Sequence, residues 1–156
     1  MTEVRFVVDG MLLGLGRWLR FLGCDVVCFE ERRKSGLVRL ATGEGRIILS
    51  KDTKFCAEHA SLSVYIKGET VREQLREVAR RFLKKAQPEF YLTRCSRCNE
   101  ILQKVEKASV RGLVPDYVFE KHQAFRQCPV CHRLYWDGDH ARNIRKVLDA
   151  LWTEKP

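Results

Sequence analysis

The sequence has no run of about 18 consecutive apolar residues, the length that a membrane-spanning helix requires. Its first residues lead directly into a strand-like segment and lack the apolar core and small-residue cleavage site of a secretory signal. It also has no low-complexity segment, and with 45% hydrophobic residues it can bury a core. We therefore expect an ordered cytoplasmic protein with no membrane partner.

Acidic residues are few relative to basic ones. The chain has 20 Asp and Glu against 29 Lys and Arg, which gives a formal net charge of +9. An excess of positive charge favours a polyanionic partner such as a nucleic acid. The alternative is a solvated basic surface that binds no nucleic acid.

Strand-like and helix-like segments alternate through the first half of the chain. Short apolar, β-branched runs predict strands, and apolar residues at helical spacing, such as Leu12, Leu15 and Leu19, predict helices. We expect strands over 4–8, 26–29, 47–49 and 62–66, and helices over 11–22, 37–42, 71–84 and 139–152. This alternation predicts an α/β fold with a mostly parallel sheet flanked by helices.

Four of the seven cysteines form two CxxC pairs, Cys95 with Cys98 and Cys128 with Cys131. Two residues between cysteines let one tight turn direct both thiolates at a single ion, and two such turns supply the four sulfurs of a closed structural zinc site. Without an export signal this pattern indicates metal binding in a reducing compartment. The alternatives are redox-active CxxC pairs, or His132 as a substitute ligand.

Two carboxylates follow predicted strands: Asp9 ends the first and Asp52 comes just after the third. The carboxyl ends of parallel strands meet at one edge of a sheet, so the two side chains are expected to lie near each other. Oxygen ligands there suit magnesium or manganese, which can activate water against a phosphodiester. The alternative is that both aspartates are turn or cap residues.

Several segments, in a fixed order, have the pattern of a known family. They are Phe6–Leu12, Leu15–Asp25, Gly45–Asp52, Glu73–Val78, Arg94–Asn99 and Cys128–His140. In this order they resemble the Mut-seven C-terminal ribonuclease domain family. The resemblance implies a PIN-like α/β nuclease domain over 1–90, a four-cysteine zinc ribbon over 91–138 and a C-terminal helix over 139–156.

The same resemblance implies metal-dependent cleavage of RNA. It assigns Asp9 and Asp52 as catalytic, metal-binding acids. It also implies that Arg17 and Arg20 contact phosphate or support the edge of the core.

The chain departs from the family pattern at one place. Acidic residues usually stand just before the segment that begins at Leu37, where this sequence has Lys34–Gly36. PIN-type sites generally gather three or four acids. We therefore consider Glu30 or Glu31, together with Glu69, as the carboxylates that complete the catalytic set.

We expect a ribonuclease that holds magnesium or manganese at the strand ends. The alternative is a non-catalytic RNA-binding zinc-ribbon protein with a degenerate PIN-like site, and a third interpretation is a protein-interaction scaffold. The expected RNA surface joins arginines of the predicted helix 71–84 to Arg97 and Arg133, unless that helix face is merely solvated. Tyr135 and Trp136 either stack on bases or pack over the zinc site.

Overall fold

The main sheet has four parallel strands in the order β2-β1-β3-β4, in a computed structural model that describes residues 4–155. They are β1 (Arg5–Val8), β2 (Asp25–Cys28), β3 (Arg46–Ser50) and β4 (Ser63–Tyr65). Phe6, Val7 and Val8 have no exposed surface, because β1 is central and both sheet faces are covered. The predicted α/β fold, with a parallel sheet flanked by helices, is confirmed.

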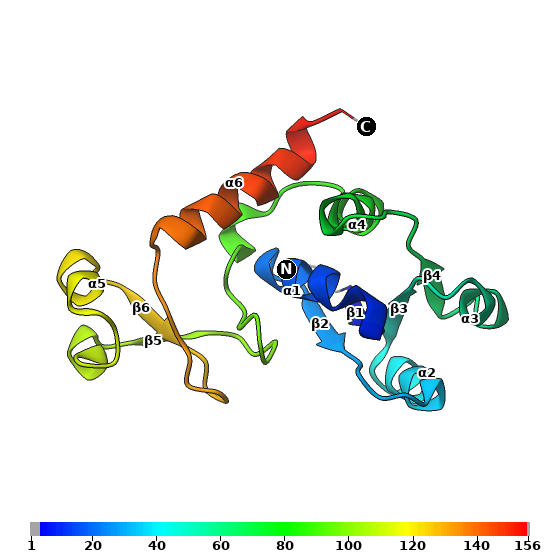
Figure 1. Cartoon of the computed structure of the whole chain (residues 1–156), viewed down its shortest axis with the longest axis horizontal. Helices are drawn as coiled ribbons and strands as arrows, with labels where there is room; N and C mark the ends of the chain where they lie inside the picture. Colours follow the sequence, from blue (N-terminus) through cyan, green and yellow to red (C-terminus); the bar gives the residue numbers. More distant parts are fainter. Residues whose placement is uncertain (1–3, 156) are drawn as a thin grey trace.

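Helices cover both faces of this sheet (Figure 1). On one face lie η1 (Gly10–Leu12), α1 (Leu13–Phe21), α4 (Val71–Val78) and α6 (Asp139–Thr153). On the other lie α2 (Lys34–Glu44) and α3 (Thr53–Glu58). Because side chains alternate along a strand, Phe6 and Val8 pack with α1 while Val7 packs with α2 and α3.

Two helices differ from the sequence expectation. The segment predicted as one helix over 71–84 is α4, begun by a capping box between Thr70 and Glu73, followed by a π-helical turn, η2 (Ala79–Leu83). Helix α3 was not predicted, because its six residues are too few to show a helical period. No helix within residues 4–155 has the length and apolarity to cross a membrane.

The second half of the chain builds a small antiparallel sheet in the order β5-β6-β7. Figure 1 shows β5 and β6 of this sheet near α5. After η3 (Pro88–Phe90) come β5 (Gln103–Val105), η4 (Lys107–Val110), α5 (Asp116–Lys121), β6 (Phe125–Gln127) and β7 (Leu134–Tyr135). Helix α6 then returns to the main core, where Ile144, Leu148 and Leu151 join the α1 cluster. The domain boundaries at 90 and 138 stay predictions.

Polar side chains attach the first cysteine pair to the α/β body. The buried Arg20 donates from Nε to the Val26 carbonyl at 2.9 Å and from Nη1 to the Ser96 carbonyl at 2.9 Å. Asn99 accepts from the Val26 amide at 2.9 Å and donates to the Asp25 carboxylate at 2.7 Å. The turn that carries Cys95 and Cys98 is therefore held against the exposed edge of β2.

Candidate active site and metal centre

The four paired cysteines meet at one point. The Sγ atoms of Cys95, Cys98, Cys128 and Cys131 all lie within 4.8 Å of one another, and Cys95 and Cys128 have no exposed surface. The Sγ atoms of Cys95 and Cys131 are 3.7 Å apart. Tetrahedral zinc, with Zn–S bonds of about 2.3 Å, places its sulfur ligands about 3.8 Å apart. The donor set therefore fits a metal such as zinc, and His132 lies outside the group.

The two CxxC turns share one backbone geometry. The residue after each turn, Asn99 or His132, has a positive φ of 68° or 62°. Its amide donates to the carbonyl of the first cysteine of the turn, Cys95 at 2.9 Å or Cys128 at 3.0 Å. In each turn the amide of the second cysteine donates to the sulfur of the first, at 3.4 and 3.5 Å. Hydrogen bonds to sulfur favour the thiolate that a metal requires.

Tyr135 lies over this cysteine centre, and its hydroxyl is 3.1 Å from Cys95 Sγ. Burial raises the pKa of the Cys95 thiol, but the Tyr135 hydroxyl and backbone amides outweigh burial and lower that pKa to about 7. Burial and the neighbouring sulfurs raise the pKa of Cys98 to about 12. Trp136 packs against Phe125, with ring centres 6.4 Å apart. Both aromatic residues thus contribute to packing in this part of the chain.

Asp9 lies at the carboxyl end of β1 and is only 5% exposed. Its Oδ1 accepts from the Met11 amide at 3.1 Å, which caps η1. Its Oδ2 accepts from the hydroxyl of Ser50, the last residue of the adjacent strand β3. Asp9 is therefore a buried carboxylate held in a fixed orientation.

Asp52 lies two residues beyond Ser50, which connects it to Asp9. The Asp52 amide donates to Ser50 Oγ at 3.1 Å, while Asp52 Oδ1 caps α3 by accepting from the Phe55 amide at 2.9 Å. Asp52 Oδ2 forms an ion pair with Lys34. The hydrogen bond from Lys34, followed by that from the Phe55 amide, lowers the pKa of Asp52. The structure brings Asp9 and Asp52 to the same edge of the sheet.

The other predicted acids are not gathered there. Glu30 is exposed, and the Glu69 side chain is 86% exposed and lies 3.6 Å from Lys51 Nζ. Within residues 4–155, the cysteines are the only group of three or more possible ligand residues at metal-binding spacing. The structure therefore brings neither Glu30 nor Glu69 together with the two aspartates. The position where the family pattern has acids instead supplies the ammonium of Lys34, which neutralises Asp52.

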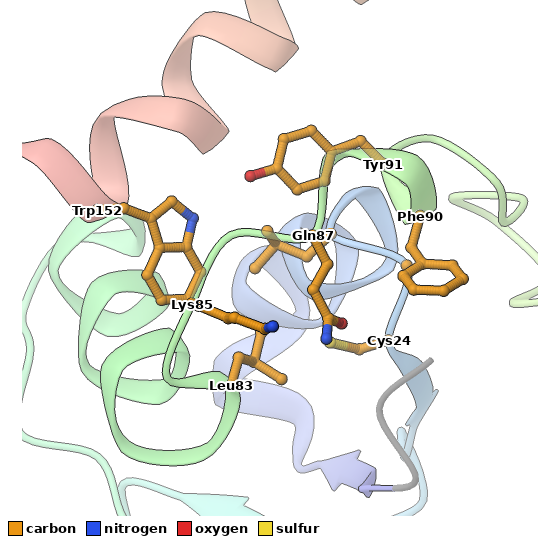
Figure 2. A pocket seen from close by; sticks show the side chains of 9 residues that line it. Cys24, Leu83, Lys85, Gln87, Phe90, Tyr91 and Trp152 are labelled. Atoms are coloured by element: carbon orange, nitrogen blue, oxygen red, sulfur yellow. The ribbon is translucent and has the colours of Figure 1, made fainter.

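Three hollows on the described part of the protein bear on these sites. The smallest, about 10 Å³, lies beside Tyr91 and Trp152 (Figure 2) and has room for about one water molecule. A groove of about 450 Å³ between α2 and α3 is lined by Lys34, Asp52 and His59, so it opens onto the acidic edge. A larger cleft of about 640 Å³ lies between α1, α5, β7 and the start of α6.

The predicted substrate-binding arginines separate into two kinds. Arg17 and Arg133 both line the large cleft and are exposed. Arg20 is 7% exposed and bound to backbone carbonyls, which corresponds to its alternative role at the edge of the core. Arg97 is exposed outside the cleft, and its carbonyl accepts from Arg20 at 3.1 Å.

The arginines of α4 and η2 are less available to bind RNA than the sequence suggests. Arg72 and Arg76 form ion pairs with the carboxylate of Glu154, and Arg80 donates to the Glu154 carbonyl. Glu154 directly follows α6, so these arginines fix the end of that helix. These three arginines are engaged by Glu154, although the Arg72 side chain stays 53% exposed, so the choice between an RNA surface and a solvated helix face stays a prediction.

The sequence interpretation missed three contacts that shape these sites. Ser50 bridges the two aspartates, Lys34 pairs with Asp52, and Asn99 attaches the first cysteine turn to β2. The segment Ser50–Asp52 contained the signal for the first contact, since a hydroxyl at the end of one strand can donate to the Asp9 carboxylate and accept from the backbone amide of Asp52.

Comparison with known proteins gives one match. A family model described as the Mut7-C RNAse domain matches residues 4–148. Neither a curated protein nor a solved structure matches. The matched range includes the acidic edge and the cysteine centre, so the resemblance found in the sequence is confirmed.

Proposed function

This chain belongs to the Mut7-C RNase domain family, and from this premise we propose that it is a metal-dependent ribonuclease that hydrolyses RNA phosphodiester bonds at the acidic edge of its sheet. One observation supports this site above all. Asp9 and Asp52 follow two neighbouring strands, and the Ser50 hydroxyl links them by donating to the Asp9 carboxylate and accepting from the Asp52 backbone amide. This link supports a proposal that the two carboxylates, distant in the chain, act at one edge of the sheet as a site for a divalent cation.

The donor set of this edge fits magnesium or manganese. Magnesium is commonly bound by one or two carboxylates, with water and substrate phosphate oxygens filling its other positions. Asp9 and Asp52 would hold the ion, which when bound activates water and stabilises charge on the leaving oxygen. Ser50 keeps the Asp9 carboxylate aimed at the edge, and Lys34 has to leave Asp52 before that carboxylate can bind a cation.

In this proposal the cysteine centre holds a structural zinc ion. Four thiolates fill the tetrahedral coordination of zinc, so no position stays open for substrate. The centre therefore supports the fold while the acidic edge does the chemistry. Reduced cysteines are needed for such a site, and we accordingly propose a cytoplasmic location.

The proposal is tested by RNA cleavage in manganese with Asp9→Asn and Asp52→Asn. Each change keeps the shape of the side chain and removes a negative charge, so we expect each rate to fall roughly a hundredfold or more, since a catalytic metal supplies several kcal/mol. Asp116→Asn on α5 is the matched control, because it removes an exposed carboxylate elsewhere. Cleavage by both edge variants at the parent rate would remove these acids from the mechanism.

Glu30→Gln and Glu69→Gln address the missing third acid. Both carboxylates are exposed and separate from the two aspartates. A loss of cleavage in either variant identifies a carboxylate that joins the site only with substrate and metal present.

A second function is favoured by the ion pair between Lys34 and Asp52. A lysine where the family pattern has acids can leave a site that binds RNA without cutting it. Salt-sensitive RNA binding, with no cleavage in magnesium or manganese by the parent protein, supports this alternative over the ribonuclease.

A further inference from the structure

A large hollow among the described residues lies away from the acidic edge. It is the cleft of about 640 Å³ whose walls come from α1, α5, β7 and the first turns of α6. Its volume is in the range of pockets that hold a ligand of several hundred daltons. Neither Asp9 nor Asp52 lines it. Its chemistry therefore has to be inferred from other residues.

Positive charge dominates the lining of this cleft. Six basic residues line it against two acidic ones; the basic residues are Arg17, Arg94, Lys121, Arg126, Arg133 and Arg145. Both acids are already paired, Asp137 with Arg145 at 3.6 Å and Asp139 with Arg142.

Within the described residues, five of the six basic side chains have no carboxylate partner, and one of these, Arg94, donates to the backbone carbonyls of Gly23 and Asn99. The other four are not engaged in this way. Among residues 4–155, no carboxylate lies within 4.0 Å of the charged groups of Arg17, Lys121, Arg126 and Arg133. The arginines of α4, in contrast, are occupied by Glu154. Of these two basic regions, the cleft is the one that can offer its charge to a polyanion.

Aromatic rings alternate with these charges. The guanidinium of Arg17 lies 5.6 Å from the centre of the Phe21 ring, and that of Arg133 lies 5.9 Å from the Tyr135 ring. Tyr117 is 72% exposed, one helical turn before Lys121 on α5, and both line the cleft. An exposed ring beside a free cation can stack on an unpaired base while the cation contacts its phosphate.

We propose that this cleft binds single-stranded RNA and leads the strand toward the acidic edge. The inference rests on the proposed function, since it takes RNA as the substrate. Helix α1 connects the two places, because Asp9 caps the turn before it and Arg17 lies at its middle. At 1.5 Å per residue, the separation along the helix is on the order of 12 Å. A duplex buries its bases in the stack, so a single strand is what such rings can hold.

The test is binding of a short fluorescent oligouridine by the full chain, with no divalent metal added and no chelator that could remove zinc. Arg17→Glu and Lys121→Glu change opposite walls, and each is expected to weaken affinity about tenfold and to lower the salt dependence by about 0.7 in log–log slope. Tyr117→Ala is expected to weaken affinity about tenfold through lost stacking.

Arg81→Glu is the matched control, since it makes the same charge reversal at an exposed position of η2 outside the cleft. Its affinity should change by less than about threefold, as for an exposed charge at a distance. Equal losses in Arg81→Glu and the cleft variants overturn the proposal, as does a duplex RNA that binds as tightly as the single strand. Zinc content and thermal melting establish that each variant is folded.

Failure of this inference is distinct from failure of the ribonuclease proposal. Asp9→Asn should bind oligouridine like the parent while losing cleavage. If the parent protein binds RNA through the cleft but does not cleave it, the cleft proposal holds and the ribonuclease proposal is wrong. If the cleft variants cleave and bind RNA like the parent, the cleft proposal is wrong and the ribonuclease proposal holds.

Discussion

The cysteine centre and the acidic edge are assembled in different ways. Both bring charged ligand groups together from distant parts of the chain. The cysteine centre has its full set of four sulfurs, and Cys95 and Cys128 each accept an amide hydrogen bond inside a turn of defined geometry. The acidic edge has two carboxylates, and one of them is paired with Lys34.

This difference shows how each site manages the repulsion between its ligands. Four thiolates in a buried place require a metal to coexist, so the fold of that region depends on the ion. At the acidic edge the Ser50 hydroxyl and the Lys34 ammonium stabilise the two carboxylates without an ion. We therefore expect the cysteine centre to need its metal for folding, and the acidic edge to need its metal only for chemistry.

The largest expected effect comes from breaking the cysteine centre with Cys128→Ser. Structural zinc contributes about 10–16 kcal/mol in small zinc-binding peptides, which exceeds the whole stability of most domains. We expect the variant to purify without stoichiometric zinc and the segment 95–136 to lose amide hydrogen-exchange protection. Metal analysis and exchange mass spectrometry measure both.

Cys56→Ser on α3 is the control for this change. Cys56 is buried between the main sheet and the helices α2 and α3, and it takes no part in the cysteine group. It should keep its zinc and the protection of the ribbon. If Cys128→Ser keeps its full zinc content and its amide hydrogen-exchange protection, Cys128 has no structural role as a zinc ligand.

The sequence predicted the cysteine centre well because its geometry is local. Two residues between cysteines define each turn, whatever the rest of the chain does. The sheet was also predictable, because buried strands such as the one ending at Val8 are short, apolar and β-branched. The helix at 53–58 was not predicted because it is short and its cap, Asp52, comes only two residues after the end of β3.

Contacts across long stretches of chain could not be predicted. The sequence predicted an RNA surface or a solvated face for the arginines of α4, and only the fold shows that Glu154 lies against Arg72 and Arg76. The pairing of Lys34 with Asp52 depends on where α2 begins relative to β3. Such contacts are fixed by tertiary packing, and no periodicity in the sequence encodes them.

The next largest effect is expected when a third carboxylate is added to the acidic edge. Lys34→Glu replaces the competing ammonium with a third carboxylate, so manganese affinity should rise by roughly tenfold or more, as expected for one added opposite charge at close range. Lys34→Ala removes only the ion pair. Because an exposed pair contributes about 0.2–1 kcal/mol, it should raise affinity by no more than about fivefold. Manganese binding followed by electron paramagnetic resonance measures both.

Lys54→Glu is the control, since Lys54 lines the same groove without pairing with Asp52. If Lys34→Glu and Lys54→Glu raise affinity equally, general charge explains the change and Lys34 has no special place at the edge.

The smallest expected effect is a difference in melting temperature between variants of the two CxxC turns. Asn99 and His132 occupy equivalent positions with positive φ, but only Asn99 reaches the α/β body, through Val26 and Asp25. Glycine accepts positive φ without strain, so His132→Gly should leave the melting temperature unchanged or raise it slightly. Asn99→Gly keeps the turn but leaves the Val26 amide unpaired, a loss of about 1–3 kcal/mol. Its melting temperature, measured with zinc bound, should therefore fall by several degrees. If the two variants have equal melting temperatures, the hydrogen bonds of Asn99 to Val26 and Asp25 do not contribute to the stability of the α/β body.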